Sequence, residues 1–158
     1  MKKIFSVSVE NQSGVLSKVA GLFARRSYNI ESLTVGETND PTISNMTIVS
    51  NGSQHDLEQI EKQLNKKLDV IKVRTFKEEE AVLREIIFIK LKYTAADRAN
   101  LLEICQICKA EIVDSTDTYM ILFLCDTPDR VDKFIDMVRK FNITDISRTG
   151  TLAMKKCK

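Results

Sequence analysis

The segment ENQSGVL combines residue types that can hold a small anion. Asn11, Ser13 and Gly14 end an alternating apolar run and precede a helical pattern. Ser13 is placed to cap that helix, and the free donors of its first turn would then be the backbone N–H groups of Gly14, Val15 and Leu16. The positive end of the helix dipole favours a carboxylate there, and the amide of Asn11 can donate to a ligand or accept from its ammonium group. The segment therefore fits an amino acid, and it also fits a turn and a helix cap without any ligand.

The CQIC segment is the second candidate for chemistry, as a redox dithiol or half of a zinc site. Cys105 and Cys108 lie in ANLLEICQICKAE, where apolar residues recur at helical spacing, so both sulfurs are expected to pack as small buried groups. No second CxxC and no histidine cluster completes a tetrahedral metal site, and His55, the only histidine, is expected to be exposed in the first turn of a helix. The chain also offers no nucleophile with a plausible base, which predicts no independent enzymatic activity.

Composition indicates a globular protein without a nucleic-acid or membrane partner. The 158 residues are 43% hydrophobic and 29% charged. A net charge of +2 and 6% aromatic residues provide little for neutralising phosphates or stacking bases. Ser6, Ser8 and Glu10 interrupt the apolar run of the N-terminus, which is therefore neither a signal peptide nor a membrane span. The four cysteines fit a reducing compartment, so we expect a cytoplasmic protein.

The elements that must position these residues occur twice in the same order. In the first half we expect a strand at KIFSVSVE, a helix through 15–23, a hairpin of NIESLTVG and TISNMTIVS, a helix with Leu57, Ile60, Leu64 and Leu68 on one side, and a strand at DVIKVRTF. In the second half we expect a strand at IIFIKLKY, a helix through 101–108, strands at EIVDS and YMILFLC, a helix after Thr127 and Pro128, and a strand at ITDISRTG. The charged segment KEEEAVLRE between them is expected to be a linker or a frayed helix.

A βαββαβ unit of this length is typical of the ferredoxin-like arrangement. The sequence therefore predicts an α+β protein of two tandem ferredoxin-like modules, residues 1–77 and 78–158. Each module leaves one sheet face and its outer strands uncovered, and exposed sheet edges favour association. We therefore expect at least a homodimer.

The longer run ENQSGVLSKVAGLFARRSYNIESLTVG closely resembles the N-terminal regulatory module of acetolactate synthase small subunits, an ACT-domain family. The similarity continues through DPTISNMTIV and EQIEKQLNKKLDVIKV, and more loosely through REI, AEIVDST and SRTG in the second half. One departure is Ser27, which stands where the family usually has the glycine of RGYNI. A serine can turn the chain there at a modest conformational cost.

This resemblance implies regulation rather than catalysis. It implies that the chain binds the catalytic large subunit, activates it, and makes it responsive to valine or another end product of branched-chain amino-acid biosynthesis. Thiamine diphosphate, FAD and magnesium would belong to the large subunit, with no cofactor in this chain. In ACT domains the amino acid lies between the first loop of one module and the start of the second strand of its neighbour. Carried over to this sequence, the ligand-binding residues are Asn11, Gly14, Val15 and Leu16 of one subunit and Asn29 and Ile30 of the other.

The corresponding passage of the second half, LKYTAADRANLL, lacks the glycine and places Asp97 near the helix start. Aspartate caps a helix well but repels another carboxylate. We therefore predict one ligand site for each pair of modules, built from the first halves only, with the second half contacting the catalytic subunit or relaying the signal. Two alternatives remain, an amino-acid-responsive regulator of another enzyme or of transcription, and a thiol redox or metal-handling protein that uses Cys105 and Cys108.

Overall fold

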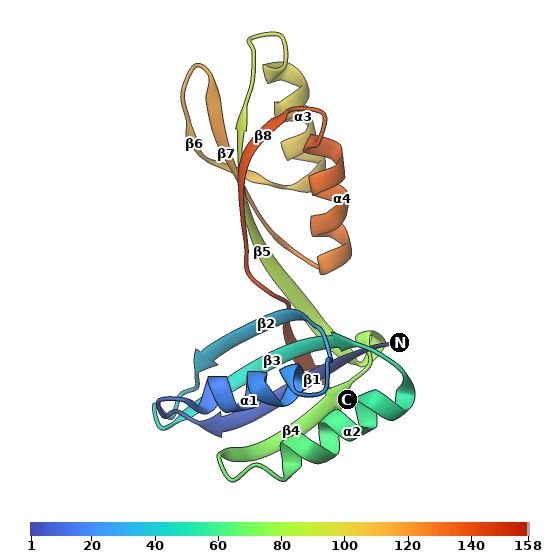
Figure 1. The fold of residues 1–158 in the computed structure, drawn as a ribbon. Coiled ribbons are helices and arrows are strands. Elements are labelled where there is room, and N and C mark those ends of the chain that lie inside the picture. The colour runs from blue at the N-terminus through green and yellow to red at the C-terminus, as the bar shows by residue number, and fades with distance from the viewer. Residues whose placement is uncertain (158) are drawn as a thin grey trace. The chain divides into compact units, whose positions relative to one another are not determined.

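The computed structural model describes residues 1–157 and divides them into two compact units (Figure 1). The first unit contains Met1–Val82 together with the segment from Thr151 onward, and the second contains Leu83–Gly150. The chain therefore enters the second unit once, leaves it once, and ends in the first. The expected division of the sequence into domains between residues 77 and 78 stays a prediction.

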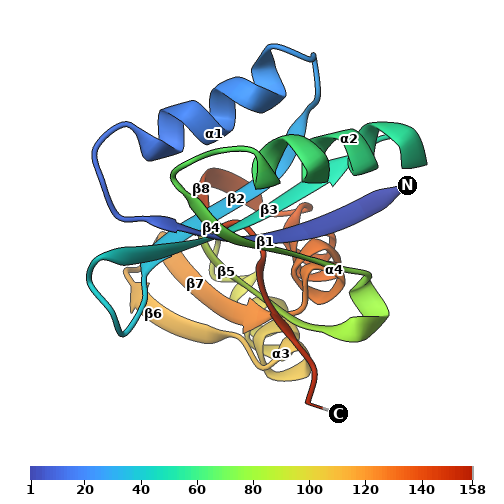
Figure 2. The ribbon, with the colours of Figure 1, turned by 90° about the horizontal axis from the view of Figure 1, so that it is seen from below.

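The first unit is a βαββαβ module with both helices on one face of an antiparallel sheet (Figure 2). Its elements are β1 (Lys2–Glu10), α1 (Val15–Ala24), β2 (Ile30–Glu37), β3 (Ile43–Asn51), α2 (Gln54–Asn65) and β4 (Val70–Phe76). The strand order is β2-β3-β1-β4, which leaves β2 and β4 as the edges. The expected order of elements is confirmed in this half.

Apolar residues of period two in β1 and of helical period in α1 and α2 form the core of the first unit. Phe5, Val7 and Val9 are at most 1% exposed, so they share the face of β1 that the helices cover. The prediction that Leu68 lies on the same helix face as Leu64 is wrong, because α2 ends at Asn65 and Leu68 is 98% exposed. The backbone N–H groups of residues 66 and 67 bond to carbonyls three residues earlier, and these tighter turns lead the chain out of the helix.

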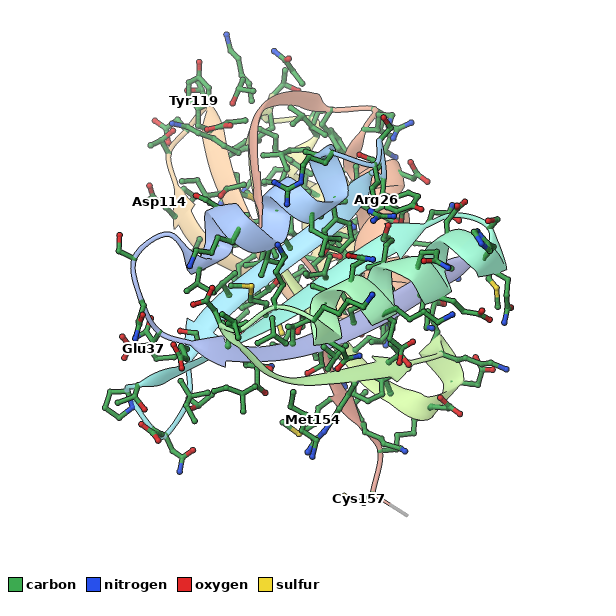
Figure 3. All side chains as sticks on the ribbon, turned by 60° about the horizontal axis from the view of Figure 1, so that its bottom comes forward. Arg26, Glu37, Asp114, Tyr119, Met154 and Cys157 are labelled. Carbon is green, nitrogen blue, oxygen red and sulfur yellow. The ribbon has the colours of Figure 1, made fainter. Side chains whose placement is uncertain are left out.

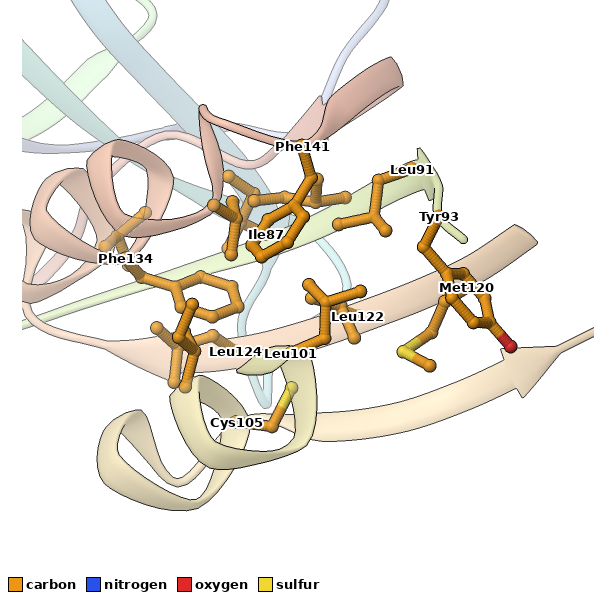
Figure 4. Close-up of a cluster of buried hydrophobic side chains, with 14 residues drawn as sticks. Ile87, Leu91, Tyr93, Leu101, Cys105, Met120, Leu122, Leu124, Phe134 and Phe141 are labelled. Atoms are coloured by element: carbon orange, nitrogen blue, oxygen red, sulfur yellow. The ribbon is translucent and has the colours of Figure 1, made fainter. Parts of the chain in front are cut away.

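The second unit repeats the same arrangement. Its elements are β5 (Ala81–Lys92), α3 (Arg98–Cys108), β6 (Glu111–Ser115), β7 (Tyr119–Asp126), α4 (Pro128–Val138) and β8 (Asn142–Arg148), with the strand order β6-β7-β5-β8. Alternate residues of β5 and β7 pack against α3 and α4 in a core that includes Ile87, Leu91, Leu122 and Phe134 (Figure 4). The predicted α+β fold of two βαββαβ modules is therefore confirmed.

The segment between the modules and the C-terminal end differ from expectation. KEEEAVLRE is not one linker or frayed helix, because Glu78–Glu80 forms a 3₁₀ turn, η1, and β5 already begins at Ala81. A further strand, β9 (Leu152–Lys155), pairs with β5 and was not predicted. This strand has only four residues, too few to display a clear period. None of the described helices has the length and apolar character that crossing a membrane requires.

The helices α1 and α3 end in the same hydrogen-bonded motif, built around residues with positive φ. Ser27 has φ 56° and Lys109 has φ 57°. The N–H of Tyr28 donates to the carbonyl of Phe23, and the N–H of Ala110 donates to that of Cys105, with a shorter bond inside each. These are Schellman motifs, in which the left-handed residue is usually glycine. The departure at Ser27 from the glycine usual in the family thus falls at a position with a left-handed backbone.

We expect Ser27→Gly to raise the free energy of unfolding by about 0.5–1 kcal/mol. The left-handed conformation costs a residue with a side chain roughly 1–2 kcal/mol, and the greater unfolded-state entropy of glycine offsets part of the gain. Ser17→Gly, inside α1, is the control, and it should instead lower stability by about 0.5 kcal/mol. Urea unfolding of both variants measures the difference, and equal changes would contradict the strain at Ser27.

Candidate functional site

The loop between β1 and α1 is shaped by Gly14 rather than by Ser13. Gly14 occupies the N-cap position with φ 85° and ψ −9°, a left-handed conformation. No side chain caps the helix, so the expectation that Ser13 would cap it is wrong. The loop instead closes through backbone bonds, in which the N–H of Val15 donates to the carbonyl of Gln12 and that of Lys18 to the carbonyl of Gly14. Glycine is needed here because an L side chain is strained at this φ.

The start of α1 offers backbone donors and an exposed apolar side chain. Among the described hydrogen bonds, none uses the N–H of Gly14 or Leu16 as a donor. A β-carbon built on Gly14 meets no atom within 4 Å, so the space beside this backbone is open. The side chain of Leu16 is 44% exposed, whereas that of Val15 is 2% exposed and belongs to the core. Of the predicted residues in this loop, Gly14 and Leu16 can therefore face a ligand, while Val15 fixes the helix to the sheet.

Asn11 holds the loop against the β2–β3 hairpin. Its Nδ2 donates to Oε1 of Glu37 at 3.0 Å and to the carbonyl of Pro41 at 2.9 Å. Its backbone N–H donates to the carbonyl of Thr42 at 2.8 Å. Both amide hydrogens of the side chain are thus engaged within the chain, and Oδ1 remains as an acceptor. Toward a ligand, Asn11 is suited to an ammonium group rather than to a carboxylate.

Glu37 is a residue of this site that the sequence did not suggest. It ends β2, and its carboxylate lies beside Asn11, which precedes it by 26 residues. The carboxylate is exposed and adds a negative charge beside Asn11, so the site contains an anionic acceptor as well as the backbone donors of the loop. The only sequence signal was a single acidic residue after a strand, and such residues are common on surfaces.

The predicted residues Asn29 and Ile30 lie at the opposite end of the sheet from Asn11. Within the first sheet β3 pairs Ile43 with Glu10, and it pairs Ser50 with Ile30. The pairs at residues 43 and 50 are separated by about 23 Å, at roughly 3.3 Å for each residue along β3. One chain therefore does not bring the two halves of the predicted site together around one amino acid.

The second unit has no equivalent of this loop. The helix α3 is preceded by a turn in which the N–H and the hydroxyl of Thr94 donate to Oδ2 of Asp97, at 2.9 Å and 2.7 Å. Asp97 occupies the N-cap position of α3, near the helix start as expected, but its side chain makes no capping bond to the helix. The hydrogen bonds from the side chain and then the backbone of Thr94 lower the pKa of the Asp97 carboxyl, which is therefore ionised at neutral pH. A negative charge at this helix start opposes a second anionic ligand.

The cysteine pair of the second unit is packed rather than poised for reaction. Cys105 is 5% exposed in the core, and Sγ of Cys108 lies 3.7 Å from Sδ of Met137. Burial raises the pKa of both thiols, and the neighbouring Cys108 raises that of Cys105 further. Within residues 1–157 no group of three or more His, Cys, Asp or Glu side chains is arranged to hold a metal ion. His55 is exposed in the first turn of α2, as expected.

We expect Cys125 and Cys157 to react quickly with an aromatic disulfide reagent at pH 8 in the folded protein, because both are exposed. Cys105 should react only in denaturant, and Cys108, which is partly buried, should react slowly. The double variant Cys125→Ser with Cys157→Ser is the control, and it should remove the fast phase. A fast phase that survives in this variant would support the redox alternative for Cys105 and Cys108.

Two family models together match nearly the whole chain. The model described as "AHAS small subunit-like ACT domain" matches residues 5–72, which contain the loop and the start of β2. The model described as "Small subunit of acetolactate synthase" matches residues 84–157. The match of the first model confirms that the first module is an ACT domain.

Individual proteins show the same similarity over the full length. The chain is 42% identical over 157 residues to the acetolactate synthase small subunit of Haemophilus influenzae, covering 99% of this chain and 96% of that protein. It is 43% identical over 154 residues to the probable acetolactate synthase small subunit of Archaeoglobus fulgidus, covering 98% and 96%. The crystal structure of the acetolactate synthase small subunit from Thermotoga maritima superposes with a TM-score of 0.93 and 34% identity, covering 100% of this chain and 99% of that one. The chain therefore belongs to the family of acetolactate synthase small subunits.

Proposed function

We propose that this chain binds the catalytic large subunit of acetolactate synthase, raises its activity, and makes it sensitive to valine or a related branched-chain amino acid. The observation that carries the proposal is that both halves of the chain match small-subunit family models. The matches cover the first module, which would bind the effector, and the second module, which would contact the catalytic subunit or relay the signal. The same matches favour acetolactate synthase over another enzyme or a transcriptional target.

The proposed effector site is formed by two copies of the chain. One copy contributes Asn11, Gly14 and Leu16 at the start of α1, and the other contributes Asn29 and Ile30 at the start of β2. The separation of about 23 Å within one chain supports this arrangement, because a single copy leaves each half incomplete. The strand β2 is an edge of its sheet and is available for association with a second copy. We therefore propose a homodimer as the effector-binding species.

The chemistry of the loop supports an amino acid as the effector. The unpaired N–H groups of Gly14 and Leu16 at the positive end of α1 suit its carboxylate. Oδ1 of Asn11 and the carboxylate of Glu37 suit its ammonium group. The exposed side chain of Leu16 suits an aliphatic side chain such as that of valine. A simple carboxylic acid would leave the acceptors unused.

We assign the group-transfer chemistry of the synthase to its large subunit, with thiamine diphosphate, FAD and magnesium bound there. This chain would supply regulation only. The four free cysteines fit a reducing compartment, and we propose that the complex acts in the cytoplasm.

Reconstitution with the large subunit tests this function. The purified chain alone is expected to make no acetolactate from pyruvate with all cofactors present, and adding it to the large subunit should raise the rate. Valine should inhibit the reconstituted enzyme more than the large subunit alone. Turnover by the isolated chain, or failure to bind and activate the large subunit, would contradict the proposal.

A further inference from the structure

The C-terminal segment of residues 151–156, which we call the C-terminal strap, lies on the face of the first sheet that α1 and α2 leave open (Figure 2). Thr151 and Ala153 are 5% and 6% exposed, whereas Leu152 and Met154 are 56% and 74% exposed (Met154 is labelled in Figure 3). The strap therefore turns alternate residues toward the sheet. A groove of about 420 Å³ runs between the sheet and the strap, with Ser6, Ser8 and Asn45 among its lining residues.

Hydrogen bonds attach the strap at both ends. At its start, the N–H of Thr151 donates to Oγ of Ser32 at 2.6 Å, and Oγ1 of Thr34 donates to the carbonyl of Thr151 at 3.4 Å. Near its end, the N–H of Lys156 donates to the carbonyl of Glu80 at 3.0 Å. The first two bonds join Thr151, the first residue after the second unit, to the edge strand β2.

The open face of the sheet is partly apolar and partly polar. Ile4 and Val49 pair across β1 and β3 and are each 1% exposed, although they lie on the opposite face from Phe5 and Ile48 of the helix-side core. Thr47, on the same open face, is 1% exposed, and its hydroxyl is a buried group without a partner among the described residues. A buried unpaired hydroxyl costs free energy, so this face of the sheet is not optimised for stability alone.

The attachment of the strap lies close to the proposed effector residues along the chain. Ser32 and Thr34 are the third and fifth residues of β2, which begins at Ile30. The register between β2 and β3 shifts between Ile30 and Ser32, so the strand is irregular where it meets the strap. Because β2 pairs with β3 alone in this sheet, its start is less constrained than a central strand.

We propose that the hydrogen bonds of Thr151 to Ser32 and Thr34 carry the effector signal from β2 to the second unit. The inference rests on the proposed function, in which the effector binds at Asn29 and Ile30. Thr151 follows the second unit directly in the chain, so a shift of β2 on effector binding pulls on or releases the end of that unit. The effector changes activity only if it binds one of two conformations of the complex more tightly than the other. These two hydrogen bonds link the conformation of β2 to Thr151, the residue at which the chain leaves the second unit.

The variants Ser32→Ala and Thr34→Val, alone and combined, test this route in the reconstituted enzyme. Each removes one hydroxyl that contacts Thr151 and leaves the residues of the proposed effector site in place. We expect valine to bind the variant with unchanged affinity in calorimetry and basal activation of the large subunit to persist. The valine concentration for half-inhibition should rise by roughly 2- to 10-fold, the range expected from one hydrogen bond. Ser8→Ala is the matched control, because Ser8 lies on the same face and bonds to Asn45 instead of the strap.

Hydrogen exchange distinguishes signal transmission from a purely structural role of the bonds between Thr151 and β2. In the wild-type chain valine is expected to alter the exchange of amides in both β2 and residues 151–155, and in the double variant it should alter β2 only. The route would be overturned if the double variant had the inhibition curve of the wild type, or if it lost valine binding. It would also be overturned if valine left the hydrogen exchange of the strap unchanged in the wild-type chain. If the wild-type chain bound none of valine, leucine and isoleucine, and none of them inhibited the reconstituted enzyme, both the proposed function and the route would be overturned.

Discussion

Gly14→Asp is expected to abolish the response of the reconstituted enzyme to valine while leaving activation intact. The new carboxylate would take the unpaired N–H groups at the start of α1 and repel the carboxylate of the ligand. At separations of about 4–5 Å and intermediate screening, this repulsion weakens valine binding by roughly 10- to 100-fold. The fold should tolerate the change at a cost of about 1 kcal/mol, because φ 85° strains any L residue, aspartate accepts a left-handed backbone better than most residues, and an acidic residue near a helix start is favoured.

Gly14→Asn is the matched control, because asparagine has the same shape as aspartate without its charge, and both tolerate a left-handed backbone better than most residues. Gly14→Ala measures the strain at φ 85° alone, at about 1 kcal/mol of folding free energy. Calorimetry with valine and urea unfolding separate binding from stability. If Gly14→Asp bound valine as tightly as Gly14→Asn, the loop would be a turn and a helix start without a ligand.

Glu85→Ala is expected to destabilise the second unit by about 3 kcal/mol. The carboxylate of Glu85 is 5% exposed and accepts two hydrogen bonds from the guanidinium of Arg148, which also bonds to Asp132. Removing Glu85 leaves the arginine with only its more exposed partner. The bond to Glu85 is the main cause of the raised pKa of Arg148. The contribution of the raised arginine pKa is therefore present at neutral pH and is lost as the pH rises through that alkaline pKa.

The exposed partner provides the control for this ion pair. Asp132 has a side chain that is 60% exposed, so Asp132→Asn should cost less than about 1 kcal/mol. The double replacement Glu85→Leu with Arg148→Met is expected to recover much of the loss, since apolar groups of similar volume need no charged partner. Urea unfolding of the three variants measures these differences. Equal losses for Glu85→Ala and Asp132→Asn would show that burial adds nothing to the pair.

Periodicity predicted the fold because both modules follow it closely. Phe5, Val7 and Val9 alternate in β1, and Leu57, Ile60 and Leu64 recur in α2, as a half-buried strand and an amphipathic helix require. Repetition of the same order then predicted two βαββαβ units. The strand β9 was not predicted, because it forms only where the chain returns to the first unit. The local sequence pattern does not encode that return.

The candidate site was predictable only in part. The loop was found from Asn11 and Gly14, but Ser13 and Gly14 are both common at helix starts, and only the backbone angle decides between them. Glu37 escaped because sheet topology, not sequence spacing, brings it to Asn11. Asn29 and Ile30 were predicted as ligand-binding residues through family resemblance alone, and they stay predictions. A binding site shared by two subunits does not produce a complete sequence motif within one part of the chain.

The return of the chain to the first unit affects how the protein folds during its own translation. Residues 1–82 leave the ribosome before the second unit does, and domains begin to fold during synthesis from the N-terminal side. The strap, which lines a groove together with Phe76 of the first unit, is translated after the whole second unit. The nascent first module therefore lacks the strap on the open face of its sheet until the second unit has been translated, and chaperones or early subunit contacts can act on this face during that interval.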